Sequence, residues 1–245
     1  MDASSLPGVR QIFRQVRCAW ENRALVPRLL TILTHDRLGK HSLGILRRVV
    51  ARGHPLSESL GLSVDQNGRP IPWLTYPFLD FFDDLNTSSW TILEFGSGQS
   101  TLYWSARAKK VVSYEHNVAW LKKMQQKVPP GADLRLFTSL EALENLSALP
   151  TQPDLVLVDG WERESCVRKC LAVFGTEPFY VLDNSERYTD ICRLFSGSGC
   201  TEIRFKGFGP VNNYDWCTSL FVTPQNLAKL ESVPVDPTIH GAGKP

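Results

Sequence analysis

The chain has 245 residues, which is enough to bury a substantial core without disulfide or metal cross-links. Its 42% hydrophobic and 21% charged residues are typical of a globular protein and exclude a collagen-like or wholly disordered chain. There is no uncharged apolar run of about 18 residues, and Arg10, Arg14 and Arg17 interrupt the apolar residues near the N-terminus. We therefore expect neither a transmembrane helix nor a secretory signal.

The cysteines form no CxxC pair and no spacing typical of a disulfide scaffold. They are Cys18, Cys166, Cys170, Cys192, Cys200 and Cys217. This pattern favours reduced thiols in a cytoplasmic protein.

The net charge of +2 conceals an uneven distribution. Residues 1–60 carry ten Lys/Arg and four Asp/Glu, whereas the rest of the chain carries 17 and 21. A basic front end of this kind suggests an anionic partner, such as a membrane surface, or a partner protein that contacts the N-terminal helices. The alternative is a helical lobe packed on the main domain.

Helical patterns dominate this basic region. The first predicted helix starts near Ser5, and the second covers Arg28–Leu33. In the third, Ser42 is the expected N-cap, Leu43–Ala51 the body and Gly53 the stop.

Further along, short apolar runs alternate with helical patterns. The expected strands are Thr91–Phe95, Lys110–Tyr114, Asp133–Phe137, Asp154–Val158 and Phe179–Leu182. The helical patterns fall near 78–85, 100–108, 117–127, 139–147, 163–173 and 186–195. This alternation predicts an α/β fold with a parallel sheet and helices on both faces.

Two last strands, Glu202–Lys206 and Ser219–Thr223, are joined by a loop too short for a crossover helix and should pair antiparallel. We divide the chain into a helical N-terminal extension (1–64), the α/β domain (65–225) and a C-terminal tail (226–245).

The loop after the first strand indicates a binding site. Glu94 is followed by FGSGQST and then a helix, and ligands of open α/β sheets bind beyond such strand ends. Gly96 and Gly98 permit close approach of a ligand, and the helix beginning near Ser100 offers free N–H groups.

Glu115 supports this interpretation, because it ends the second strand 17 residues after Gly98. An acid at this place can accept both ribose hydroxyls of a nucleoside cofactor. The alternative role, capping the next helix, is better suited to Asn117.

Two residues distinguish between cofactors. Thr101 stands where a dinucleotide fingerprint requires its third glycine, which weighs against NAD. Glu94 would repel a pyrophosphate but attract an ammonium or a sulfonium.

Residues 91–117 (TILEFGSGQSTLYWSARAKKVVSYEHN) resemble the first two strands of a class I S-adenosylmethionine-dependent methyltransferase, and the resemblance extends over about 70–225. It implies a Rossmann-like sheet of seven strands whose last strand is antiparallel. It also implies that S-adenosylmethionine is the cofactor, with Glu115 on its ribose and His116 near its adenine. The other cofactor-binding residues expected from this comparison are Tyr76, Glu94, Gly96, Ser97, Gly98, Ser100, Thr101 and Asp159.

Polar residues follow the fourth and fifth strands. Asp159, Asp183 and Asn184 would form an oxygen cluster suited to Mg²⁺ or another divalent cation. The arrangement is similar to the metal site of the catechol-type, cation-dependent O-methyltransferases. That family usually has a lysine as base three residues after the first aspartate, where this chain has Glu162. The alternative is a metal-free catalytic role for Asp159 or Asp183, with Asp183 and Asn184 capping the next helix.

Aromatic residues are expected at the same rim, either as core or as a stacking wall for a sugar or aryl ring. They are Trp73, Tyr76, Trp161, Tyr214 and Trp216.

The sequence thus predicts an enzyme that methylates an oxygen of a small molecule or glycan. One alternative is a nucleic-acid or protein methyltransferase that uses the basic N-terminal lobe, although no NPPY-like or cysteine-nucleophile motif for base methylation is present. The others are an NAD(P)-binding oxidoreductase and a non-catalytic module that retains only the fold.

Overall fold

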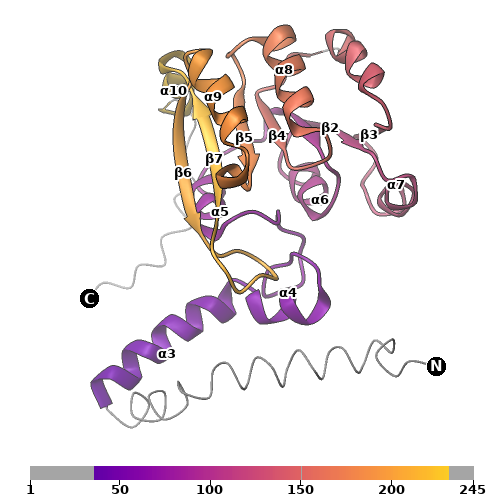
Figure 1. Cartoon of the computed structure of the whole chain (residues 1–245). Coiled ribbons are helices and arrows are strands. Elements are labelled where there is room, and N and C mark those ends of the chain that lie inside the picture. Colours follow the sequence, from indigo (N-terminus) through magenta and orange to yellow (C-terminus); the bar gives the residue numbers. More distant parts are fainter. Residues whose placement is uncertain (1–35, 150, 232–245) are drawn as a thin grey trace, which may run out of the picture. The chain divides into compact units, whose positions relative to one another are not determined.

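The computed structural model describes residues 36–149 and 151–231 (Figure 1). The chain divides into two compact units, residues 1–52 and 53–245. In the first unit the described residues form helix α3 (Asp36–Ala51). The two helices expected before it lie outside the described residues.

Helix α3 corrects one prediction, because it begins at Asp36 and Ser42 therefore lies within it rather than at its N-cap. The expected body, Leu43–Ala51, lies entirely within this longer helix.

The second unit contains a seven-stranded sheet in the order β3-β2-β1-β4-β5-β7-β6. The first five strands are parallel, whereas β7 runs antiparallel to both β5 and β6. This confirms the predicted Rossmann-like methyltransferase sheet. The strands are β1 (Thr91–Phe95), β2 (Lys110–Glu115), β3 (Ala132–Leu136), β4 (Leu155–Val158), β5 (Phe179–Asp183), β6 (Thr201–Gly207) and β7 (Trp216–Val222).

Helices cover both faces of this sheet (Figure 1). The α-helices of the unit are α4 (His54–Leu60), α5 (Tyr76–Asp83), α6 (Gln99–Ser105), α7 (Val118–Gln125), α8 (Arg163–Phe174), α9 (Thr189–Gly197) and α10 (Pro224–Glu231). Two 3₁₀ segments, η2 (Leu140–Ala148) and η3 (Ser185–Arg187), replace parts of the predicted helices near 139–147 and 186–195. Helix α10 crosses the expected start of the tail at residue 226.

The alternation of side chains along β1 explains the two cores. Ile92 packs in the cluster that includes Phe78 of α5 and Trp104 of α6. Leu93 belongs to the opposite cluster, which includes Val167 of α8. Burial of both faces accounts for the nearly continuous apolar character of the parallel strands.

The strand register positions the site. Phe95 at the end of β1 lies opposite Tyr114 of β2 and Val158 of β4, and Val158 lies opposite Leu182 of β5. The residues that follow these strands therefore gather at one edge of the sheet.

No helix among residues 36–149 and 151–231 is long and apolar enough to cross a bilayer.

Two glycines bring the loops after β1 and β4 into contact. Gly96 has a φ of +101°, and a Cβ on it would lie 2.9 Å from the Cα of Gly160. A Cβ on Gly160 would in turn lie 2.7 Å from the nitrogen of Gly96. Neither loop can hold its present position if either residue has a side chain.

We therefore predict that Gly96→Ala destabilises the protein by about 2 kcal/mol or more, through both its φ and the clash. The matched control is Gly98→Ala, because Gly98 has an extended φ of 179° and no atom within 4 Å of its added Cβ. Urea unfolding should separate the two variants. Equal stability of both would contradict the role of the glycine contact.

Candidate functional site

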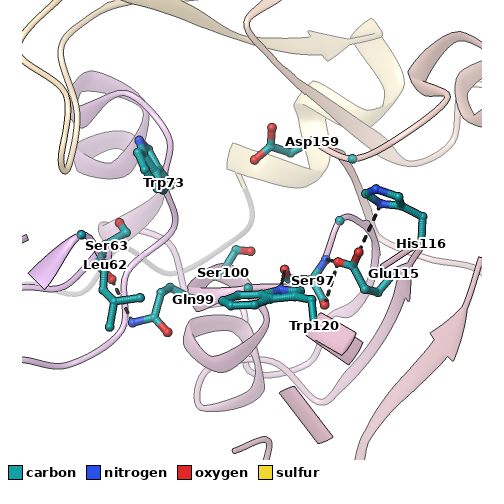
Figure 2. Close-up of a pocket in the computed structure, with 14 residues that line it drawn as sticks. Leu62, Ser63, Trp73, Ser97, Gln99, Ser100, Glu115, His116, Trp120 and Asp159 are labelled. Carbon is teal, nitrogen blue, oxygen red and sulfur yellow. Dashed lines mark hydrogen bonds and ion pairs between the residues drawn. The ribbon is translucent and has the colours of Figure 1, made fainter. Parts of the chain in front are cut away.

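A cleft of about 280 Å³ lies over the carboxyl ends of β1, β2 and β4 (Figure 2). Glu115 and His116 stand on one side of it and Trp73 on the other. Its lining comprises Gly61, Leu62, Ser63, Trp73, Gly96, Ser97, Gly98, Gln99, Ser100, Glu115, His116, Trp120, Asp159 and Gly160. We call it the cofactor cleft, because residues that the sequence predicts to bind a cofactor line it. The structure thus brings together most of the residues that the sequence predicted for cofactor binding.

Glu115 ties the glycine loop to the end of β2. Its Oε2 accepts hydrogen bonds from the backbone N–H and the hydroxyl of Ser97, both at 3.0 Å. Its Oε1 accepts the N–H of Asn117 at 2.7 Å and lies 3.2 Å from Nδ1 of His116. The side chain of Asn117 caps α7 by accepting the N–H of Trp120, as the sequence suggested. The carboxylate is therefore held rigidly where it borders the cleft.

Thr101, at the position of the missing third glycine, anchors the loop from below. Its hydroxyl donates to Oε2 of Glu94 at 2.5 Å and accepts the N–H of Gly98 at 2.9 Å. The hydroxyl of Ser113 on β2 also donates to Oε2 of Glu94, at 2.7 Å. A glycine at this position would allow closer packing of the helix on the strand, whereas Thr101 provides a hydrogen bond to the buried Glu94.

Glu94 is fully buried, and no described residue donates a hydrogen bond to its Oε1. Burial raises the pKa of Glu94 to about 7, against the hydrogen bonds from the hydroxyls of Thr101 and Ser113. A positively charged group near Glu94 would lower the pKa of Glu94 and favour its ionised form. The ionised carboxylate would in turn attract a positively charged ligand.

A second cleft of about 210 Å³ adjoins the first, because Trp73 and Asp159 line both. The complete lining is Trp73, Asp159, Asp183, Asn184, Arg187, Asn212, Tyr214 and Trp216. We call it the acceptor cleft, because it lies at the strand ends where the sequence predicts the catalytic residues that face the acceptor. It contains both predicted catalytic aspartates, and it combines aromatic rings with amide and charged groups.

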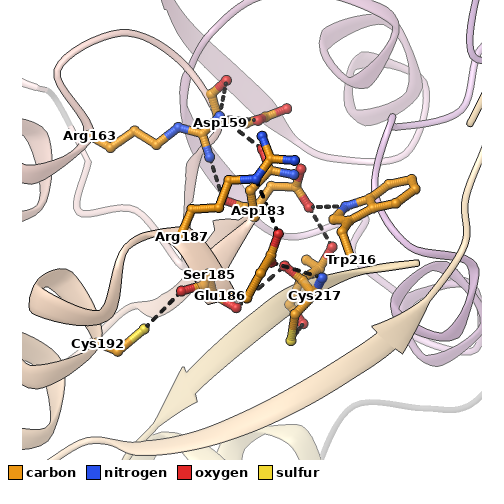
Figure 3. A network of polar contacts seen from close by, with 11 residues as sticks. Asp159, Arg163, Asp183, Ser185, Glu186, Arg187, Cys192, Trp216 and Cys217 are labelled. Carbon is orange, nitrogen blue, oxygen red and sulfur yellow. Dashed lines mark hydrogen bonds and ion pairs between the residues drawn. The ribbon is translucent and has the colours of Figure 1, made fainter. Parts of the chain in front are cut away.

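Asp183 is held at the edge of the acceptor cleft by two donors. Its Oδ1 accepts the indole N–H of Trp216 at 2.9 Å and the hydroxyl of Thr218 at 2.6 Å (Figure 3). Burial raises the pKa of Asp183 to about 6, although these bonds and the charge of Arg163 act in the opposite direction. A carboxylate of this pKa is ionised at neutral pH and suited to accept a proton.

The expected metal site contains a guanidinium. Nη2 of Arg163 donates to Oδ1 of Asp159 at 2.9 Å and to Oδ1 of Asn184 at 3.4 Å. No group of three His, Cys, Asp or Glu side chains in the described part of the chain is arranged to hold a metal ion. The residues present therefore do not fit a divalent cation at this place.

The aromatic residues divide between wall and core. Trp73 and Tyr214 are 41% and 52% exposed and line the clefts, whereas Trp161 stacks with His116 at 6.0 Å between ring centroids. Trp216 is buried yet borders the acceptor cleft through its bond to Asp183. Tyr76 is buried against Phe208 and is not among the residues that line the cofactor cleft.

Reasoning from sequence missed several wall residues. Leu62 and Ser63, which follow α4, line the cofactor cleft, and Gln99 donates to the carbonyl of Ser63 at 3.3 Å. Trp120 of α7 also lines it and donates to the carbonyl of Ser97 at 2.8 Å. Of these residues only Trp120 could have been suspected from the sequence. It lies one helical turn after Asn117, and its indole N–H requires a hydrogen-bond acceptor.

No family model matches the sequence, and no curated protein matches it. Solved structures with a similar chain path include an O-methyltransferase of Bacillus cereus in complex with SAH (TM-score 0.49, 14% identity, covering 60% of this chain and 78% of that chain). Another is a precorrin-6y C5,15-methyltransferase of Geobacter metallireducens (TM-score 0.48, 14% identity, 60% and 87%). A third is an rRNA methylase of Streptococcus thermophilus (TM-score 0.45, 12% identity, 59% and 93%).

These proteins carry different acceptors in their names, so the comparisons assign no substrate to this chain. What the strand order itself defines is the sheet of the class I methyltransferases.

The buried Glu94 generates a prediction about stability. Its folded-state pKa of about 7 exceeds the ordinary value of 4.5, so the folded protein holds a proton that the unfolded chain releases between these values. The free energy of unfolding should therefore fall between pH 4.5 and 7, by up to about 3 kcal/mol from this group. Glu94→Gln should remove this contribution and make the fall between pH 5 and pH 8 smaller, as measured by urea unfolding, whereas the contribution of Asp183 remains. An unchanged pH dependence in Glu94→Gln would show that the carboxyl is not the cause.

Proposed function

We propose that the protein is an S-adenosylmethionine-dependent methyltransferase. The observation that carries this proposal is the charge of the cofactor cleft. Glu115 and Asp159 line it, and none of the described lining residues is lysine or arginine. Such walls disfavour the pyrophosphate of a dinucleotide and favour a sulfonium and an ammonium.

We place the nucleoside and the methionine part of the cofactor at opposite ends of the cofactor cleft. Glu115 would accept the ribose hydroxyls, and His116, stacked on Trp161, would border the adenine. The methionine part would lie along Gly96, Gly98 and Ser100, towards Asp159 and the acceptor cleft. Ser97 and Thr101 would support this loop through their bonds to the two glutamates.

The proposed reaction is transfer of a methyl group to a hydroxyl. The acceptor oxygen forms a bond to the methyl carbon, the carbon–sulfur bond breaks with its electron pair going to sulfur, and the hydroxyl proton passes to Asp183. Since Oδ1 of Asp183 is occupied by Trp216 and Thr218, we assign the proton to Oδ2. Asp159, which borders both clefts, would orient the hydroxyl towards the methyl group.

The acceptor cleft favours a small polyhydroxylated molecule or a glycan. Trp73 and Tyr214 offer exposed aromatic surface on which a sugar ring can stack. Asn184, Arg187 and Asn212 offer donors and acceptors around it for hydroxyl groups. The cleft volume of about 210 Å³ suits one ring rather than an extended polymer segment.

Calorimetry tests the cofactor first. We expect the protein to bind S-adenosylmethionine and S-adenosylhomocysteine and to show no affinity for NAD or NADP. Glu115→Ala should weaken this binding by more than about tenfold, because both the ribose acceptor and the clamp on Ser97 are lost. The exposed Glu177, which pairs with Lys229, provides the control Glu177→Ala. Binding of NAD(P) instead, or an unchanged affinity in Glu115→Ala, would refute the proposal.

Asp183→Asn tests the proposed base. Asparagine retains an oxygen for Trp216 and Thr218 but cannot accept the proton at neutral pH. With an acceptor found by screening sugars and small alcohols, transfer should fall at least about a hundredfold. The affinity for S-adenosylhomocysteine should stay within about twofold, since Asp183 does not line the cofactor cleft. Retention of full transfer by this variant would exclude Asp183 as the base.

A further inference from the structure

We infer that Arg163 takes the place of a divalent cation between the ends of β4 and β5, so that the site works without a metal. The role of Arg163 in catalysis rests on the proposed methyl transfer. The exclusion of a metal ion rests only on how the side chains are arranged.

The guanidinium is bonded on every side. Nε of Arg163 donates to the carbonyl of Gly160 at 3.2 Å, Nη1 to the carbonyl of Asp183, and Nη2 to Asp159 and Asn184 (Figure 3). Its carbon lies 4.8 Å from the centroid of the Tyr188 ring, and only 11% of the side chain is exposed. A cation bound to the same oxygens would have to displace a buried, fully paired arginine.

The third expected ligand is occupied as well. Oδ1 of Asp183 accepts two hydrogen bonds from β7, from Trp216 and Thr218. A hard cation needs six or more oxygens close together, and here the amide, one oxygen of each carboxylate and two carbonyls already have donors.

The backbone on both sides is shaped for this contact. Glu162, directly before Arg163, has a φ of +54°, and Asn184, directly after Asp183, has a φ of +55°. Both lie in the left-handed region, which costs a residue with a side chain about 1 kcal/mol. Two left-handed turns therefore lie next to the two ends of the bridge that the guanidinium makes.

Arg163 is accordingly a positioning residue. It joins the loop of Asp159 to the loop of Asp183, supplies the positive charge that a metal would supply, and lines the far side of these loops rather than either cleft. An acceptor of this site needs no pair of adjacent hydroxyls to chelate a metal, and one hydroxyl within reach of Asp183 suffices.

Titration of the full chain with Mn²⁺, followed by electron paramagnetic resonance, tests this inference. The wild type should bind no Mn²⁺ in a manner that depends on Asp159. Arg163→Met keeps the packing on Tyr188 but removes the charge, and we expect it to bind Mn²⁺ roughly tenfold or more tightly than the wild type. The double variant with Asp159→Asn should lose that gain.

Two further variants serve as controls. Arg168→Ala, on the same helix, breaks an exposed pair with Glu164 and should leave Mn²⁺ binding at the wild-type level. Arg163→Lys keeps a positive charge and should also exclude Mn²⁺. If Arg163→Met does not fold, Arg163→Gln takes its place, because it removes the charge but keeps a hydrogen-bond donor and should likewise gain Mn²⁺ binding.

Asp159-dependent Mn²⁺ binding by the wild type would overturn the inference, and so would a folded Arg163→Met that gains none. The measurement contains no S-adenosylmethionine, so its failure and a failure of cofactor binding are separate results.

Discussion

The contact between Gly96 and Gly160 is the constraint on which the site depends. It brings two loops so close that neither tolerates a Cβ, and it does so where β1 and β4 are paired neighbours. The first loop carries Ser97, Gly98 and Ser100, and the second carries Asp159. The distance between the cofactor cleft and the acceptor cleft is thus set by a contact between two backbone segments.

The electrostatics of the site follow from this closeness. Glu94, Asp159 and Asp183 end or follow neighbouring strands and would repel one another as free carboxylates. The chain offsets this in two ways: burial raises the pKa values of Glu94, Asp159 and Asp183, and Arg163 pairs with Asp159. A cationic cofactor would complement the remaining negative charge, so binding and ionisation favour each other.

Much of this arrangement could be predicted from the sequence, because it depends on local patterns. The apolar runs predicted where the strands lie along the chain, and the residues directly after the predicted strands, such as Glu115 and Asp183, lie at one edge of the sheet as expected. The role of Arg163 could not be predicted in this way. It depends on the left-handed turn at Glu162, directly before Arg163 at the start of α8. Because Glu162 is not a glycine, the sequence does not indicate a left-handed turn at this position. The wall formed by Leu62 and Ser63 was missed for a similar reason. The sequence of a short helix and turn does not indicate that these residues come to lie beside the cofactor cleft.

The segment before β1 links the two clefts further. The backbone N–H of Thr75 donates to the hydroxyl of Thr218 at 3.1 Å, and that hydroxyl donates to Asp183 at 2.6 Å. The hydroxyl of Thr75 donates to the carbonyl of Phe205 at 2.9 Å, and the N–H of Tyr76 to that of Phe208, so the segment is fastened to both β6 and the loop after it.

Trp73, two residues earlier, lines both clefts. Trp73 thus belongs to a segment that is hydrogen-bonded through Thr218 to the proposed base. The buried position of Tyr76 acquires a reason here: its ring, packed on Phe208 and His54, anchors this segment from behind. The sequence left open whether the aromatic residues form core or wall, and the structure divides them: Trp73 and Tyr214 line the clefts, whereas Tyr76 packs behind the backbone that presents Trp73.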